Sequence, residues 1–172
     1  MRHLKPRSLV LTGLLLTVSV ILFGCFTTTL NLGSADAAKV DVLYCGDWHF
    51  TWQDKDQSKS ADLIVRNFDG KQYYVEWKEA GEKPSRMSGF LVPIKDATFA
   101  QLTNLGDKGE LSSDHLIVRV QFKADKLTLR HLNDEFFKDV HTDDALKQKI
   151  EQNVDSDAMY GESVTGALVS QP

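Results

Sequence analysis

The chain has 172 residues, of which 42% are hydrophobic, four are proline and two are cysteine. This composition excludes wholesale disorder and a disulfide-rich scaffold. The formal net charge is −4, and losing Arg2, Lys5 and Arg7 with the segment before Cys25 lowers the 20 basic residues to 17 against 24 acidic ones, which gives −7. Because such a surface repels phosphate backbones, no nucleic-acid partner is expected.

Residues 1–24 are predicted to be a lipoprotein-type signal peptide. Three basic residues within positions 1–8 precede an uncharged, largely apolar stretch, LVLTGLLLTVSVILFGCF, at positions 9–26. A basic start before an apolar run is the layout of a secretory signal, whose positive charges stay on the cytoplasmic side. We therefore expect the rest of the chain to lie outside the cytoplasm, in the cell envelope.

The end of the apolar run, Leu22-Phe23-Gly24-Cys25, resembles a bacterial lipobox. The resemblance implies cleavage before Cys25 and lipid attachment to its thiol, so that the membrane is a partner through the lipid anchor. In a Gram-negative cell it implies the outer membrane, facing the periplasm. Two alternatives stay open. They are ordinary cleavage near Ala37 and an uncut anchor helix, since 18 residues come close to the ~20 that span a bilayer.

Residues 25–40 lack a helical or strand pattern of any length and are predicted to be a flexible tether. Aromatic residues then alternate strictly with polar residues in Trp48-His49-Phe50-Thr51-Trp52. This alternation predicts a strand with its three aromatic side chains on one face. A second strand at 61–68 and a third at 71–78 flank Asp69-Gly70, a pair typical of a type I′ hairpin turn.

Four more strands are predicted at 87–94, 98–105, 115–123 and 127–132. Asn133 could cap a helical turn at 134–140, and Thr142 is expected to cap a helix at 143–153. A final stretch, 164–169, could add a short edge strand. The sequence therefore predicts a mainly β domain at 41–172: a single small antiparallel β-barrel or strongly curved sheet with one C-terminal helix.

The start of the first strand, Gly46-Asp47-Trp48, resembles the Gly-x-Trp of the lipocalin-like (calycin-type) barrels. The wider order of elements is similar to that of small bacterial lipoproteins of unknown function. The resemblance implies that Trp48 closes one end of the barrel beneath Arg130, which lies in a late strand. It says little about activity, because folds of this kind serve many functions.

Seven aromatic residues are the main candidates for a site, since they either line a pocket or fill the core. Small barrels of ~8 strands either pack solid or hold one small ligand, so both readings stay open. The set consists of Trp48, Phe50, Trp52, Tyr73, Trp77, Phe90 and Phe122.

No catalytic residue, metal site or cofactor is predicted, and the chain is expected not to be an enzyme. The histidines lack metal-ligand spacing, and Cys45 lies beside Asp47, which disfavours a reactive thiolate. The favoured function is a lipid-anchored envelope lipoprotein that binds a small apolar molecule or an envelope lipid. The alternative is an envelope protein–protein interaction module, such as an inhibitor or assembly factor, with a solid barrel core.

Overall fold

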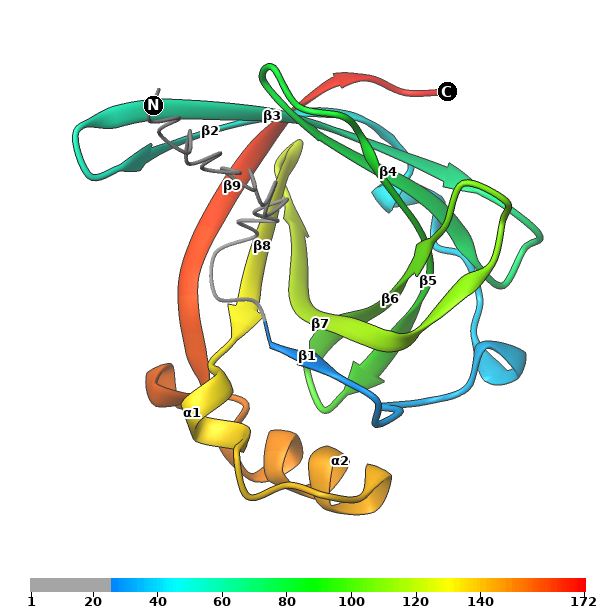
Figure 1. The fold of residues 1–172 in the computed structure, drawn as a ribbon, viewed down its shortest axis with the longest axis vertical. Coiled ribbons are helices and arrows are strands. Elements are labelled where there is room, and N and C mark those ends of the chain that lie inside the picture. Colours follow the sequence, from blue (N-terminus) through cyan, green and yellow to red (C-terminus); the bar gives the residue numbers. More distant parts are fainter. Residues whose placement is uncertain (1–25) are drawn as a thin grey trace, which may run out of the picture.

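A computed structural model describes residues 26–172, so the predicted signal segment and Cys25 lie outside the described residues. Eight long strands run alternately up and down in space, in the order of the sequence, and form a ring (Figure 1). They are β2 (Gly46–Asp54), β3 (Gln57–Asn67), β4 (Tyr73–Glu79), β5 (Ser85–Ile94), β6 (Ala97–Leu105), β7 (Leu111–Lys123), β8 (Lys126–Leu132) and β9 (Tyr160–Ser170).

The ring is a closed antiparallel barrel. Strands β2 to β8 each pair with the next strand along the chain, and β9 lies between β8 and β2 and completes the circle. Closure leaves no long unpaired edge among these eight strands. The predicted fold class is confirmed, and the architecture is compatible with a lipocalin-like barrel.

The C-terminal strand is longer and more central than the sequence indicated. A short edge strand was predicted at 164–169, whereas β9 spans eleven residues and pairs on both sides. Its inward positions include Gly166, which lies opposite Phe50 of β2. A Cβ atom at Gly166 would come within 2.6 Å of the Phe50 ring. The glycine at this position therefore leaves room for the Phe50 ring where β9 pairs with β2.

The hairpin predicted at Asp69-Gly70 exists, but it is not a type I′ turn. Gly70 has a φ of 83°, while Asp69 is not among the residues with positive φ. The Asp69 carboxylate instead accepts hydrogen bonds from the backbone N–H groups of Lys71 and Gln72. This local bonding is a common property of Asp and favours a wider loop.

Two helices lie between β8 and β9 and pack outside the ring (Figure 1). Asn133 caps α1 (Asp134–Phe137) and Thr142 caps α2 (Asp143–Asn153), each through its side-chain oxygen, as predicted. Leu146 and Ile150 of α2 are fully buried in one cluster with Ile117, from the outer face of β7. Within the described residues, no helix is long and apolar enough to cross a membrane.

The segment predicted to be a flexible tether lies against the barrel over residues 26–40. Strand β1 (Thr27–Thr28) pairs with β7, and the Leu32 N–H donates to Oε1 of Gln101 on β6. Phe26 and Leu32 are buried in the same cluster as α2. Local sequence patterns give no sign of this packing, because the apolar side chains of Phe26 and Leu32 cover the outer face of strands that are distant in sequence. The segment continues through a short 3-10 turn, η1 (Ala35–Ala37).

Candidate functional site

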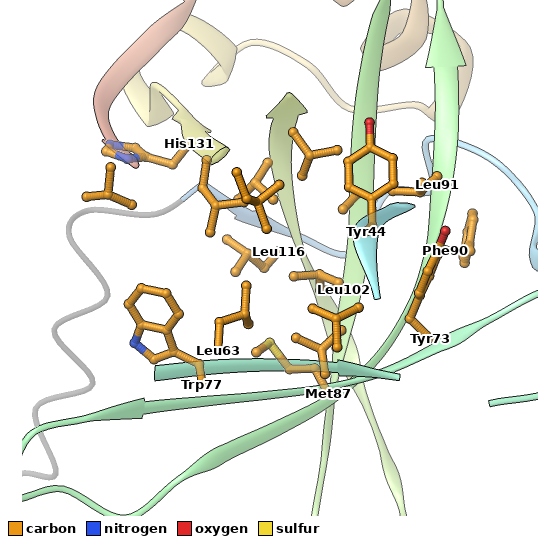
Figure 2. A pocket seen from close by; sticks show the side chains of 18 of the residues that line it. Tyr44, Leu63, Tyr73, Trp77, Met87, Phe90, Leu91, Leu102, Leu116 and His131 are labelled. Carbon is orange, nitrogen blue, oxygen red and sulfur yellow. The ribbon is translucent and has the colours of Figure 1, made fainter. Parts of the chain in front are cut away.

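The barrel encloses a cavity of about 130 Å³. Every barrel strand except β2 contributes lining side chains, and nearly all of them are apolar. Figure 2 shows Leu63, Leu102 and Leu116 among the lining side chains, with His131 at the edge of the group. A largely apolar cavity with a few polar groups is the usual form of a small-molecule site.

The predicted aromatic set divides between the cavity and the core. Tyr73, Trp77 and Phe90 line the cavity. The other four, Trp48, Phe50, Trp52 and Phe122, do not line it and pack against aromatic rings. The ring centroids lie 5.9 Å apart for Trp48 and Phe122, 5.3 Å for Phe50 and Trp77, and 6.1 Å for Trp52 and Trp77. Trp77 therefore stands at the boundary between filled core and cavity.

One end of the barrel is filled by the segment that precedes β2. This segment forms the 3-10 turn η2 (Val42–Tyr44), and Tyr44 both lines the cavity and contacts Phe122, at 6.4 Å between ring centroids. The Tyr44 carbonyl accepts a hydrogen bond from Nε1 of Trp48. Burial raises the pKa of the Tyr44 and Tyr73 hydroxyls, so both stay neutral. We call this end the closed end.

The predicted contact between Trp48 and Arg130 does not form. Trp48 is 1% exposed at the closed end, as expected for a closing residue. It pairs with Leu168 on β9, while Arg130 pairs with Ser163, five residues away, or about 17 Å at 3.3 Å per residue. The Arg130 guanidinium instead lies 4.4 Å from the centroid of the Tyr160 ring. The resemblance suggested the pair, but strand register separates the two residues.

The opposite end, where β8 finishes and β9 begins, carries the polar part of the cavity. Arg130 pairs with Ser163 and Leu132 with Tyr160, so the two residues Gly161 and Glu162 both lie opposite His131. This is a β-bulge, a feature that re-aims side chains beside functional sites. His131 and Glu162 both line the cavity. We call this end the open end, because Glu162 is exposed to solvent.

Because Gly161 has no side chain, the His131 ring can occupy the space beside it. A Cβ atom there would clash with the imidazole. Burial lowers the pKa of His131, and Arg130 acts in the same direction, while the carboxylates of Glu162 and Asp134 oppose it. The imidazole is therefore neutral near pH 7, a form in which one ring nitrogen can donate a hydrogen bond and the other can accept one.

Glu162 was not singled out by sequence reasoning, which found many carboxylates and no way to rank them. The usable signal was the glycine that precedes it, since a glycine inside a strand often marks a bulge. No hydrogen bond or ion pair joins the Glu162 carboxylate to another residue in the described part of the chain. The open end therefore presents a neutral imidazole and a solvated carboxylate side by side.

Two other reactive side chains, Cys45 and His49, lie away from this end. Cys45 is buried in the cluster that contains Trp48 and Tyr73, and burial raises the pKa of its thiol. His49 contacts Asp62, at 2.7 Å between Nδ1 and Oδ1, at an exposed position. Across residues 26–172, no three His, Cys, Asp or Glu side chains are grouped so that they could hold a metal ion.

Comparisons with known protein families, with curated proteins and with solved structures find no match to this chain. The cavity and its two ends are therefore the features of the molecule that indicate a function. The cavity supplies apolar burial along its length and hydrogen-bonding groups at one edge. This arrangement suits the binding of a molecule that is apolar over most of its surface.

Proposed function

We propose that the barrel is a non-catalytic binding module for a small apolar molecule. The single observation that carries the proposal is the apolar cavity of about 130 Å³ inside the ring. An apolar protein cavity of about 150 Å³ takes up benzene, so this volume suits a single ring or a short alkyl chain. Each buried methylene contributes about 0.8 kcal/mol, so a longer alkyl chain that places only a few of its carbons in the cavity already gives measurable affinity.

A tryptophan substitution in the cavity wall tests the proposal. Leu116 and Leu111 lie on the same strand, β7, but Leu116 lines the cavity and Leu111 is exposed. Octan-1-ol should bind the purified full-length protein in calorimetric titration, and Leu116→Trp should abolish binding by filling the space. Leu111→Trp is the matched control and should bind as the unaltered protein does. Equal binding by both variants, or no binding by the unaltered protein, would contradict the proposal.

The proposed module is anchored in the cell envelope by lipid at Cys25. The basic start, the apolar run and the lipobox-like residues support the anchor. The position of Phe26 bears on the distance between the barrel and the membrane. Its ring packs against that of Phe137 in α1, with 5.0 Å between the ring centroids. A lipid on the preceding residue would therefore hold the barrel close to the bilayer. In a Gram-negative cell the proposed location is the outer membrane, facing the periplasm.

Cys25→Ser tests the anchor directly. The substitution should abolish labelling by radioactive palmitate and move the protein from the membrane fraction to the soluble fraction. Cys45→Ser is the control, because Cys45 is buried in the barrel core and should not affect labelling. Labelling that persists in Cys25→Ser would contradict the lipoprotein proposal and favour cleavage near Ala37 or an uncut anchor.

A second candidate function is the docking of an envelope protein at the closed end. Val42, Leu43 and Phe68 expose 68%, 50% and 70% of their surface there. The Val40 N–H donates to the carbonyl of Gly70, which ties their two segments together. A photo-crosslinking amino acid at position 68 should capture a partner in cells, while one at the exposed position 111 should not. The same capture pattern at both positions would exclude this candidate.

A further inference from the structure

The polar groups of the cavity are unevenly distributed between its two ends. At the closed end, the Tyr73 hydroxyl donates to the Asp41 carbonyl and accepts from the Asp41 N–H. The Tyr44 hydroxyl is hydrogen-bonded to the Thr98 side chain. These hydroxyls already have partners within the protein. At the open end, His131 and Glu162 line the cavity, and no Lys, Arg or His side chain within residues 26–172 forms an ion pair with the Glu162 carboxylate. Among the described residues, the polar groups that remain available to a ligand's head therefore lie at the open end.

Among the described residues, Glu162 is the charged side chain that lines the cavity. The carboxylates of Glu162 and Asp134 raise the pKa of His131, and the guanidinium of Arg130 lowers it. A second cation, Arg119, does not line the cavity and donates to the Val154 carbonyl and the Tyr160 hydroxyl. Arg130 faces away from the cavity, where its Nη2 lies 3.0 Å from Oδ1 of Asp157 and its guanidinium covers Tyr160. Its charge is therefore balanced by a partner of its own. A ligand head beside His131 meets an unbalanced carboxylate.

We infer that the cavity takes a short-chain amphiphile with an ammonium head, whose tail lies in the barrel and whose head pairs with Glu162 at the open end. This inference rests on the proposed function. His131, neutral and beside Glu162, supplies a further hydrogen-bond acceptor for the ammonium group. An anionic head in the same place is repelled by Glu162, and a hydroxyl head is neither attracted nor repelled by the charge.

Three ligands with one tail and different heads test the inference. Octylammonium, octan-1-ol and octanoate carry charges of +1, 0 and −1 near neutral pH. In calorimetric titration of the purified full-length protein, octylammonium should bind about tenfold more tightly than octanoate, with octan-1-ol between them, where tenfold corresponds to about 1.4 kcal/mol. Raising the salt concentration should narrow this difference, because Glu162 is exposed and salt screens its charge.

Glu162→Gln tests whether Glu162 is the residue that selects the ammonium head. The substitution keeps the size of the side chain and should bring octylammonium and octanoate to within about threefold of each other, while octan-1-ol binding is unchanged. Glu82→Gln is the matched control, because Glu82 is an exposed carboxylate in the loop between β4 and β5 and does not line the cavity. This control should preserve the preference for octylammonium.

The outcomes separate this inference from the proposed function. If octan-1-ol fails to bind the unaltered protein, the proposed function itself is wrong. If octan-1-ol binds but octanoate binds as tightly as octylammonium, the barrel is a binding module and the ammonium inference is overturned. A preference for octylammonium that survives Glu162→Gln also overturns it, because the charge that selects the head then lies elsewhere.

Discussion

The interior of this barrel has a filled side and a hollow side. The filled side is β2, whose Trp48 and Phe50 are 1% and 0% exposed and do not line the cavity described above. The hollow side is formed by the other strands, and it includes smaller inward residues on β6 to β8, such as Ala100, Val118 and Leu129. An eight-stranded barrel is only just wide enough to be filled by side chains. The cavity therefore arises from the uneven distribution of side-chain volume around the ring.

Strand β9 joins the two sides and meets each with a glycine. Gly166 leaves room for the ring of Phe50 on the filled side, and Gly161 leaves room for the imidazole of His131 at the open end. The first glycine serves packing and the second serves the polar edge of the cavity. Strand β9 therefore accommodates both rings through glycines at two positions.

Trp48→Ala should give the largest loss of unfolding free energy, because it removes a buried side chain from the filled side. Truncation of a fully buried Trp costs about 3–5 kcal/mol, a large part of the ~5–15 kcal/mol that stabilises a typical domain. Trp77→Ala should cost less, because Trp77 already borders the cavity and is only partly buried. Denaturant-induced unfolding of both variants measures the difference. Equal losses of unfolding free energy would mean that the two sides are packed alike.

Gly166→Ala and Gly161→Ala compare the two sides with one substitution. The added methyl at Gly166 meets the Phe50 ring in a packed core, and overpacking of this kind costs about 1–3 kcal/mol. At Gly161 it meets His131, which is only partly buried and can turn toward solvent. We expect a smaller loss of unfolding free energy there, together with altered binding of octylammonium. The reverse order of stabilities would show that the open end is the more rigid one.

Local patterns predicted local features of the fold well. Alternation at residues 48–52 identified β2 with its aromatic face, and Asn133 and Thr142 identified the starts of both helices. Each of these features depends on a few neighbouring residues. The mainly β barrel class followed from the number and spacing of such strands.

Features that depend on distant contacts were missed. The partner of Arg130 is set by the register of β8 with β9, and the packing of residues 26–40 depends on the outer face of β6 and β7. The bulge that presents Glu162 is likewise a property of two paired strands. The sequence left open whether the aromatic residues line a pocket or fill the core. The structure shows both, because the volume left in a ring depends on all eight strands together.

The smallest expected effect concerns the protonation of His131. Burial is the largest influence on this imidazole and lowers its pKa below the ordinary value of about 6.5, against the opposing carboxylates of Glu162 and Asp134. Between these two pKa values the unfolded chain binds more protons than the folded one. His131 therefore favours the folded state above about pH 6.5, and this contribution is lost as the pH falls through its folded pKa.

His131→Gln should remove this part of the pH dependence. The measurement is the free energy of unfolding at about pH 7.5 and about pH 5.5, where the unaltered protein should lose more stability on acidification than the variant does. His141→Gln is the control, because His141 is exposed in the turn before α2 and lines no part of the cavity. The control should lose as much stability as the unaltered protein. If His131→Gln shows that same loss, the imidazole at the open end is hydrated in the folded protein, and the hollow side extends to solvent past His131.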